Sequence, residues 1–275
     1  MTQRGQICFF IPVFLLFLLF ILLPSPRTLI DSFHHHEAGR SEFAGGLYYR
    51  FALEDPKLHR ALANNFGYLL WTLLFEVCVG LWLAVKLERD NRLNRFLRVA
   101  FFSPAVLSMV VIGLVFGFLL KDGIGLFPGL LTENRALLTI SVISGWAYCG
   151  FYMVIFLAGL ASIPGEILEA ATLDGASGWQ TFWRIKLPLM REVVWVALLI
   201  CFTGAFKAFD LFWVLLPNQE HTAILSTLLV QEVIRFDNRG YGSTIAVILT
   251  ILVCAIALLI QTGRLAMGRR RDSLP

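Results

Sequence analysis

Six long apolar runs divide this sequence, and they constrain its fold more than any other feature. They cover residues 7–23, 66–85, 99–120, 137–160, 193–216 and 244–260. A helix needs roughly 20 apolar residues to cross the hydrocarbon core of a bilayer, so each run has about the length of a membrane span. Composition agrees, because 57% of the 275 residues are hydrophobic and only 15% are charged.

The runs are predicted to be helices. In hydrocarbon each backbone group must be paired within its own segment, and the alternation expected of barrel strands is missing. A signal peptide is the competing interpretation of residues 7–23, which follow Arg4. That run is longer than a typical signal core and leads into Pro24-Ser25-Pro26-Arg27 rather than a cleavage site. We therefore expect an all-α integral membrane protein with six transmembrane helices.

Basic residues predict the orientation. Lys and Arg crowd the link 86–98 and the tail 264–275, and short basic segments stay on the cytoplasmic side. With six spans, both termini and the segment 161–192 are then cytoplasmic. The link 121–135 falls on the outer side.

The chain is expected to have four parts. They are an N-terminal transmembrane helix (1–26), a periplasmic loop (27–64), a five-helix core (65–263) and a basic cytoplasmic tail (264–275).

The segment between the fourth and fifth runs carries its own helix signals. Pro164 suits a helix start, and Asp174-Gly175 is expected to end that helix because glycine adopts the left-handed conformation easily. Ser177 followed by Gln180 is a capping-box pattern that begins a second helix. Trp179, Phe182 and Trp183 then share one face at helical spacing.

The same segment resembles the EAA loop of the membrane subunits of bacterial ABC importers, most of all those for carbohydrate uptake. The residues that carry the resemblance in the loop 161–191 are Glu169, Ala170, Ala171, Asp174, Gly175, Ala176, Ile185, Leu187 and Pro188. Further matches are Leu53-Glu54-Asp55-Pro56, Arg98 with Ser103-Pro104, and Phe206-Lys207-Ala208-Phe209-Asp210. The turn after the fifth run, Leu216 to His221, lacks the family's glycines.

The resemblance implies an ABC-importer permease fold in the bacterial inner membrane, with the loop acting as a cytoplasmic coupling helix. The chain would form half of the pathway for an oligosaccharide, disaccharide, polyol or glycerol phosphate. A second permease subunit, two ATPase subunits and a periplasmic solute-binding protein would complete the transporter. The chain has no G-x-x-x-x-G-K-[ST] motif. We therefore expect no enzymatic activity and no bound cofactor, with ATP and Mg²⁺ used by the ATPase partners.

Three ionisable residues fall within apolar runs, namely Glu76, Lys207 and Asp210. Such residues are costly in a bilayer and default to functional candidates. Lys207 and Asp210 could instead neutralise each other at i, i+3 spacing. Aromatic faces with convergent polar groups suit sugars. The substrate-pathway candidates are therefore Glu76, Tyr148, Tyr152, Phe209 and Asp210.

Two other features are not assigned a site. His34-His35-His36 and the five cysteines lack convincing metal-ligand or disulfide spacing, so no metal is expected. Two rival functions remain. One is an ion-coupled secondary transporter, although no convincing internal repeat is seen. The other is a non-transporting membrane scaffold that recruits a cytoplasmic protein through the segment 161–191.

Overall fold

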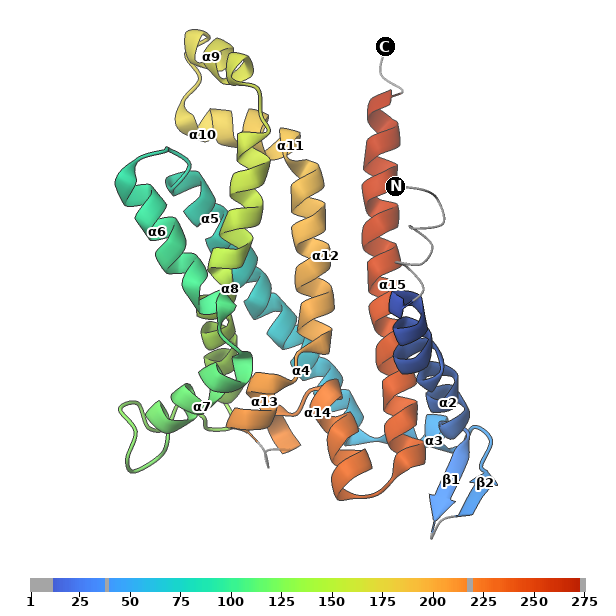
Figure 1. Ribbon diagram of the computed structural model, residues 1–275. Coiled ribbons are helices and arrows are strands. Elements are labelled where there is room, and N and C mark those ends of the chain that lie inside the picture. The colour runs from blue at the N-terminus through green and yellow to red at the C-terminus, as the bar shows by residue number, and fades with distance from the viewer. Residues whose placement is uncertain (1–11, 38–39, 217–219, 273–275) are drawn as a thin grey trace. The chain divides into compact units, whose positions relative to one another are not determined.

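The computed structural model describes residues 12–37, 40–216 and 220–272, which are mostly helical (Figure 1). The α-helices are α2 (Pro24–Asp31), α3 (Leu47–Glu54), α4 (Pro56–Thr72), α5 (Val79–Lys86), α6 (Arg92–Phe102), α7 (Met109–Leu119), α8 (Ala136–Ala161), α9 (Gly165–Leu173), α10 (Gly178–Thr181), α11 (Leu187–Leu189), α12 (Arg191–Lys207), α13 (Asp210–Leu215), α14 (Leu225–Val230) and α15 (Arg239–Asp272).

Short irregular helical turns connect several of these helices. Four are π-helical, at Leu18–Leu22, Leu73–Cys78, Phe182–Lys186 and Gln231–Arg235, and two are 3₁₀ turns, at Ser103–Val106 and Glu220–Thr222. The strands β1 (His34–Glu37) and β2 (Arg40–Phe43) form an antiparallel hairpin in which His34 pairs with Phe43.

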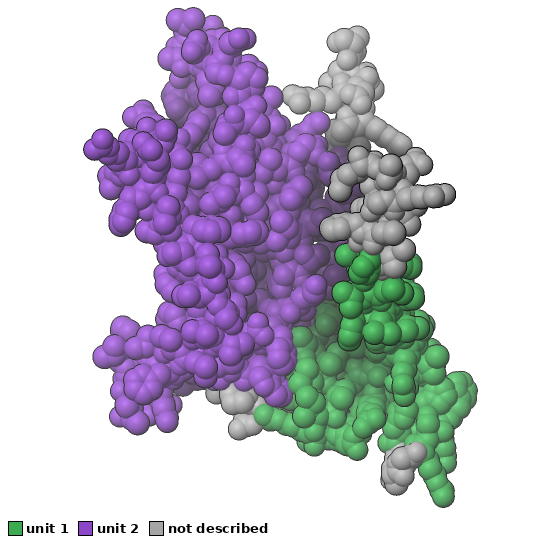
Figure 2. Space-filling view, in the orientation of Figure 1, with its two compact units in different colours: residues 1–59, 225–252 green, residues 60–224, 253–275 purple. Residues whose placement is uncertain are grey.

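The described residues group into two compact units (Figure 2). Unit 1 comprises the described part of residues 1–59 together with 225–252. Unit 2 comprises residues 60–224 and 253–275, again as far as they are described. Helices α4 and α15 each contribute residues to both units.

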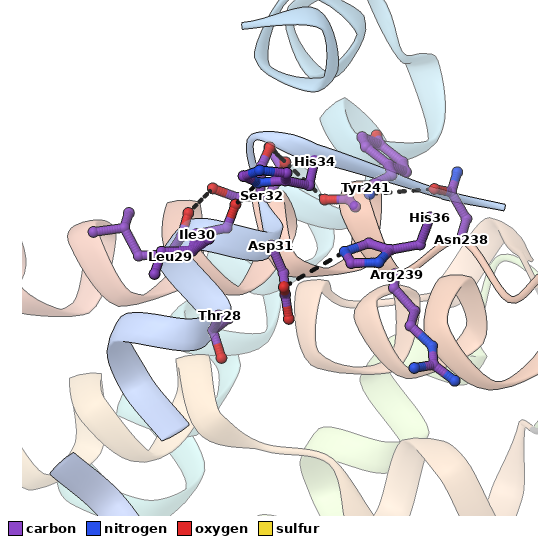
Figure 3. Close-up of polar contacts among 12 residues, drawn as sticks. Thr28, Leu29, Ile30, Asp31, Ser32, His34, His36, Asn238, Arg239 and Tyr241 are labelled. Carbon is purple, nitrogen blue, oxygen red and sulfur yellow. Dashed lines mark hydrogen bonds and ion pairs between the residues drawn. The ribbon is translucent and has the colours of Figure 1, made fainter. Parts of the chain in front are cut away.

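In unit 1 the start of α15 packs against the hairpin and α3. The Tyr241 hydroxyl donates to the Asp55 carboxylate, and the Thr244 hydroxyl donates to the Ser32 carbonyl at 3.3 Å. A Cβ on Gly240 would lie 2.4 Å from the His34 carbonyl oxygen, so this approach requires glycine. Figure 3 shows His36 directed at Asp31, with Nε2 and Oδ1 3.5 Å apart.

Unit 2 is organised around α8, which contacts α5, α6 and α12 (Figure 1). Phe156, Met153 and Ile140 on α8 are fully buried. The contact with α6 is a backbone approach, because a Cβ on Gly150 would lie only 2.0 Å from the Phe101 carbonyl oxygen. Small residues at such positions let membrane helices pack closely.

Five helical segments are long and apolar enough to cross a membrane. They are Pro12–Asp31, Pro56–Lys86, Ala136–Ala161, Arg191–Leu215 and Arg239–Arg264. The pair Arg92–Val106 and Met109–Leu119 is bent by 92° and brings the number to six if it counts as one span. The prediction of a helical membrane protein is therefore confirmed, with five to six candidate spans.

The third span does not run straight, as the apolar run 99–120 had suggested. Helix α6 already begins at Arg92, inside the predicted link 86–98, where the Asn91 side chain accepts from the Asn94 amide. The 3₁₀ turn that contains Pro104 then ends in the extended residue Leu107, and α7 starts in a new direction. Helix α7 packs instead against α13.

The fifth span also breaks, and the suggested Lys207–Asp210 pair on one helix face is wrong. Helix α12 ends at Lys207, Ala208 is extended at ψ 135°, and α13 begins at Asp210. The two side chains therefore belong to different helices, and within the described residues no salt bridge joins them.

Residues 27–64, the predicted periplasmic loop, contain the end of α2, the hairpin, α3 and the first turns of α4. Pro56 is the first residue of α4, where its fixed φ and missing N–H are tolerated. Residues 7–11 of the first apolar run and 217–219 of the turn after the fifth lie outside the described residues.

The close contact between α8 and α6 gives a stability prediction. Gly150→Ala should destabilise the protein by about 1–3 kcal/mol, because the backbone at Phe101 must shift to admit the methyl group. Gly204→Ala on α12 is the matched control, since a Cβ there meets no atom within 4 Å. Thermal unfolding of the detergent-purified protein measures both. Equal midpoints for the two variants would contradict the close approach.

Candidate functional site

A cavity of about 530 Å³ lies inside unit 2, within the size range typical of small-molecule sites. Its walls come from the π-helical turn Leu73–Cys78, from α8, and from the break between α12 and α13. All five residues proposed from the sequence as substrate-pathway candidates line it, namely Glu76, Tyr148, Tyr152, Phe209 and Asp210. Residues from three separate apolar runs thus converge on one space.

A hydrogen-bond chain crosses one wall of the cavity. The Tyr68 hydroxyl donates to Ser144 Oγ at 3.0 Å, and Ser144 Oγ donates to Glu76 Oε1 at 2.7 Å. All three side chains are buried in the protein. Glu76 lies in a π-helical turn, a local irregularity that is frequent at functional sites. The chain fixes the direction in which the Glu76 carboxylate faces.

Another wall is formed by the break between α12 and α13. Phe209 stacks on Trp213 with ring centroids 5.3 Å apart. The side chains of Lys207 and Asp210 are exposed and line the cavity. The helix break therefore presents a cation, a carboxylate and an aromatic face to the same space.

Sequence reasoning missed the hydroxyl groups of this site. Tyr68, Thr72, Ser144 and Thr203 also line the cavity. Their signal was present, because each is a polar residue inside an apolar run, where side-chain hydroxyls hydrogen-bond within or between helices. The signal is weak because an uncharged hydroxyl side chain in a membrane helix is much commoner than a charged one.

The segment between α8 and α12 has the local structure that its residues predict. Helix α9 begins one residue after Pro164, which is the N-cap rather than the first helical residue. The helix ends in a Schellman motif, with the Gly175 amide bonded to the Thr172 carbonyl and the Ala176 amide bonded to the Ala171 carbonyl. Gly175 has a φ of +76°, as expected.

The capping box of the second helix is also confirmed. Ser177 Oγ accepts from the Gln180 amide at 3.3 Å, and Gln180 Oε1 accepts from the Ser177 amide at 2.8 Å. Trp179 and Trp183 contact each other edge to face, with centroids 5.4 Å apart. The chain then continues as one irregular helical stretch through the π-helical turn Phe182–Lys186 into α11.

This segment, residues 161–191, exposes an apolar surface. Leu173 is 89% exposed and Trp179 is 71% exposed. The predicted contact residues divide between surface and interior. Glu169, Ala170, Asp174 and Gly175 are exposed, Ala171 is buried, and Ala176, Ile185, Leu187 and Pro188 are partly buried.

Ion pairs within unit 2 show which loops share an end. Lys186 pairs with Glu88, and Arg264 Nε lies 2.6 Å from Glu192 Oε2. At the other end, Asn64 Nδ2 donates to the His221 carbonyl, and His221 Nδ1 lies 3.0 Å from Glu133 Oε1. The link 86–98 and Arg264, the first residue of the basic tail, therefore lie at one end of unit 2.

The adjacent histidines do not gather around a common centre. His35 Nδ1 lies 2.6 Å from the Tyr48 hydroxyl, whereas His36 faces Asp31. Within the described residues, no group of three or more His, Cys, Asp or Glu side chains has the arrangement of a metal site.

The long apolar helices, together with a cavity in unit 2 that is lined by both polar and apolar side chains, define a multi-spanning membrane protein with a candidate binding site among its helices. Residues 76–271 match the family model described as "Binding-protein-dependent transport system inner membrane component". The chain belongs to this family, which consists of transport proteins rather than enzymes.

Named relatives agree with the family match. A probable ABC transporter permease of Bacillus subtilis (strain 168) is 32% identical, over 91% of this chain and 92% of its own length. An osmoprotective compounds uptake permease of Synechocystis is 31% identical, over 90% and 94%. An arabinooligosaccharides transport system permease of Bacillus subtilis is 32% identical, over 90% and 84%.

The fold is also found in solved structures. A bacterial ABC transporter involved in the import of the acidic polysaccharide alginate contains a chain that is similar with a TM-score of 0.82. The similarity covers 98% of this chain and 96% of that chain at 18% identity. The fold is therefore that of an ABC importer permease, as the sequence predicts.

The Tyr68–Ser144–Glu76 chain gives a second stability prediction. Ser144→Ala should destabilise the protein by about 1–3 kcal/mol, because the buried Glu76 carboxylate then lacks its hydrogen-bond donor. Ser141→Ala is the matched control. Ser141 is equally buried on α8, but its hydroxyl bonds only the Leu137 carbonyl of the same helix. Thermal unfolding midpoints in detergent test the difference, and equal losses would argue against a structural role for the chain.

Proposed function

We propose that this chain is one of two membrane subunits of an ATP-driven importer and forms half of the pathway for a sugar or related polyol or glycerol phosphate. The pathway crosses the inner membrane. The observation that carries the substrate class is the cavity, which combines aromatic faces with hydroxyl and carboxylate groups. Aromatic faces pack on sugar rings, while carboxylates and hydroxyls bond to their hydroxyl groups.

The names of the relatives support the same substrate class. One relative is named for arabinooligosaccharides, a second as a multiple sugar-binding transport permease and a third for alpha-glucosides. An ATP-driven mechanism requires partners. The chain has no nucleotide-binding G-x-x-x-x-G-K-[ST] motif. ATP and Mg²⁺ are then used by two ATPase subunits, and this chain binds no cofactor of its own.

The segment 161–191 is the proposed docking site for an ATPase subunit. Its exposed Leu173 and Trp179 offer an apolar surface beside the carboxylate of Glu169. Glu169, Ala170, Ala171 and Gly175 would make or shape the contact, and the capped helices give it a defined form. A rigid helix held in a cleft converts closure of the ATPases into motion of the bundle and so drives alternating access.

The remaining partners and the orientation complete the proposal. A second permease subunit supplies the other half of the pathway, and a periplasmic binding protein delivers substrate. One solved relative is an alginate transporter in complex with a substrate-bound periplasmic protein. The end of unit 2 that contains Lys186, Arg191 and Arg264 would face the cytoplasm, together with both termini, because short basic segments stay inside.

Affinity purification from native membranes in mild detergent tests this proposal against its rivals. The importer predicts that a second permease and an ATPase with a Walker motif co-purify with the tagged chain. Isolation as a homodimer that transports without ATPase subunits would favour an ion-coupled carrier. A stable partner without ATPase activity would favour a scaffold.

The coupling segment gives a prediction on transport. Gly175→Ala should lower uptake per ATP hydrolysed by about tenfold, because the φ of +76° at this position strains any residue with a Cβ and distorts the Schellman turn. Gly178→Ala adds the same methyl group nearby, also into open space but without a positive φ, and should transport normally.

Glu169→Lys should have a similar effect with insertion intact, because it reverses the exposed charge offered to the ATPase. Uptake and ATP hydrolysis are measured with the complete transporter in liposomes. Normal coupling in both Gly175→Ala and Glu169→Lys would refute the docking role.

The cavity gives a prediction on substrate response. Glu76→Gln and Asp210→Ala should each lower substrate-stimulated ATPase activity of the complete complex by about 5–30-fold, since each weakens or removes a polar contact of about 1–2 kcal/mol. Basal hydrolysis should change little. Glu54→Gln, at an exposed position on α3, is the carboxylate control. Wild-type stimulation in both cavity variants would mean that the cavity does not receive substrate.

A further inference from the structure

The coupling segment is fixed to the membrane helices at a second place. Lys186 Nζ lies 2.5 Å from Glu88 Oε2, joining the π-helical turn after α10 to the link between α5 and α6. The pair is largely shielded, with side chains 16% and 29% exposed. A shielded pair is screened less by salt than a pair at the open surface.

The link that receives this contact is held rigidly. The Arg98 guanidinium donates to the Leu87 carbonyl at 2.5 Å and 3.0 Å, and to the Glu88 carbonyl at 3.0 Å. The Asn94 side chain donates to the Arg89 carbonyl at 2.9 Å. Glu88 therefore lies in a link, residues 87–89, whose backbone carbonyls accept hydrogen bonds from side chains of α6. A force applied at its carboxylate acts on both flanking helices together.

The two helices that flank this link, α5 and α6, both lead to the cavity. Helix α5 continues directly from the π-helical turn that carries Glu76. Helix α6 leads through the 3₁₀ turn at Pro104 to the bend, and the first residue of α7, Met109, lines the cavity. The link 87–89 thus connects the coupling segment to two parts of the cavity wall that lie outside α8 and α12, namely those at Glu76 and Met109.

We propose that Lys186 and Glu88 form a positioning pair that passes movement of the coupling segment to the helices carrying Glu76 and Met109. The inference rests on the proposed importer function and deepens its mechanism. Without the pair, the segment acts directly on α8 and α12 alone, and the turn with Glu76 and the start of α7 follow only through the packing of α5 and α6 on α8. ATP hydrolysis then proceeds with little transport.

Charge reversal and charge exchange test the pair. Glu88→Lys and Lys186→Glu should each lower uptake per ATP hydrolysed by about tenfold, within the usual range of coupling between sites. The double variant, with the charges exchanged, should recover to within about twofold of wild type. The complete transporter in liposomes is used, with uptake and ATP hydrolysis measured on the same preparation.

A matched control lies in the same link. Arg95 and Asp90 also form an ion pair, at 3.3 Å, but their side chains are 64% and 71% exposed. Asp90→Lys and Arg95→Glu should leave uptake per ATP unchanged, because exposed pairs contribute little. If the reversals prevent assembly, Glu88→Gln and Lys186→Met replace them, and the same loss of coupling is expected.

Each outcome decides the question. Normal uptake per ATP in the assembled single variants, or no recovery in the exchanged double variant, overturns the proposal. Loss of thermal stability with unchanged uptake per ATP also overturns it, because the pair is then merely structural. If Gly175→Ala uncouples transport but the Glu88 and Lys186 variants do not, the importer function is supported and the role of this pair is refuted. A wild-type complex without substrate-stimulated hydrolysis instead rejects the importer function itself.

Discussion

Backbone hydrogen bonding in a medium without water is the constraint on which this structure depends. A peptide group left unpaired in hydrocarbon costs several kcal/mol, so spans are helical and irregular backbone is confined to places that line a cavity or lie inside protein. Three irregular places in unit 2 fit this rule. The π-helical turn with Glu76, the start of α7 at Met109 just after the bend, and the break at Ala208 all border one cavity.

That cavity in turn depends on close packing around α8. Gly80 and Gly145 bring α5 and the π-helical turn against α8, and Gly150 does the same for α6. With backbones this close, few side chains separate the helices, and the polar groups between them must satisfy one another. The Tyr68–Ser144–Glu76 chain is the result. The same packing that stabilises unit 2 therefore orients the polar groups that face the cavity.

The sequence predicted those features of the structure whose backbone conformation is decided by residues nearby in the chain. Capping at Ser177 and the left-handed Gly175 were predicted because they depend on neighbours within a few positions. Span four was predicted within one residue at each end, since Ala136–Ala161 carries no interior charge. The bends in spans three and five were not, because Leu107 and Ala208 carry no local signal. Tertiary packing of α7 on α13 selects those conformations.

The arrangement also explains why the segment 161–191 and the cavity can act together although they lie at different levels of unit 2. Helices α8 and α12 leave the two ends of the segment and carry Tyr148, Tyr152 and Thr203 to the cavity. The Lys186–Glu88 contact adds the helices that lead to Glu76 and Met109. The helices that lead to these parts of the cavity wall are thus all connected to the segment 161–191 at one end of unit 2. A displacement of the segment therefore reaches all of them together. Packed helices move as bodies rather than deform, so the chain connections and the Lys186–Glu88 contact are sufficient to carry a displacement from that end to the cavity.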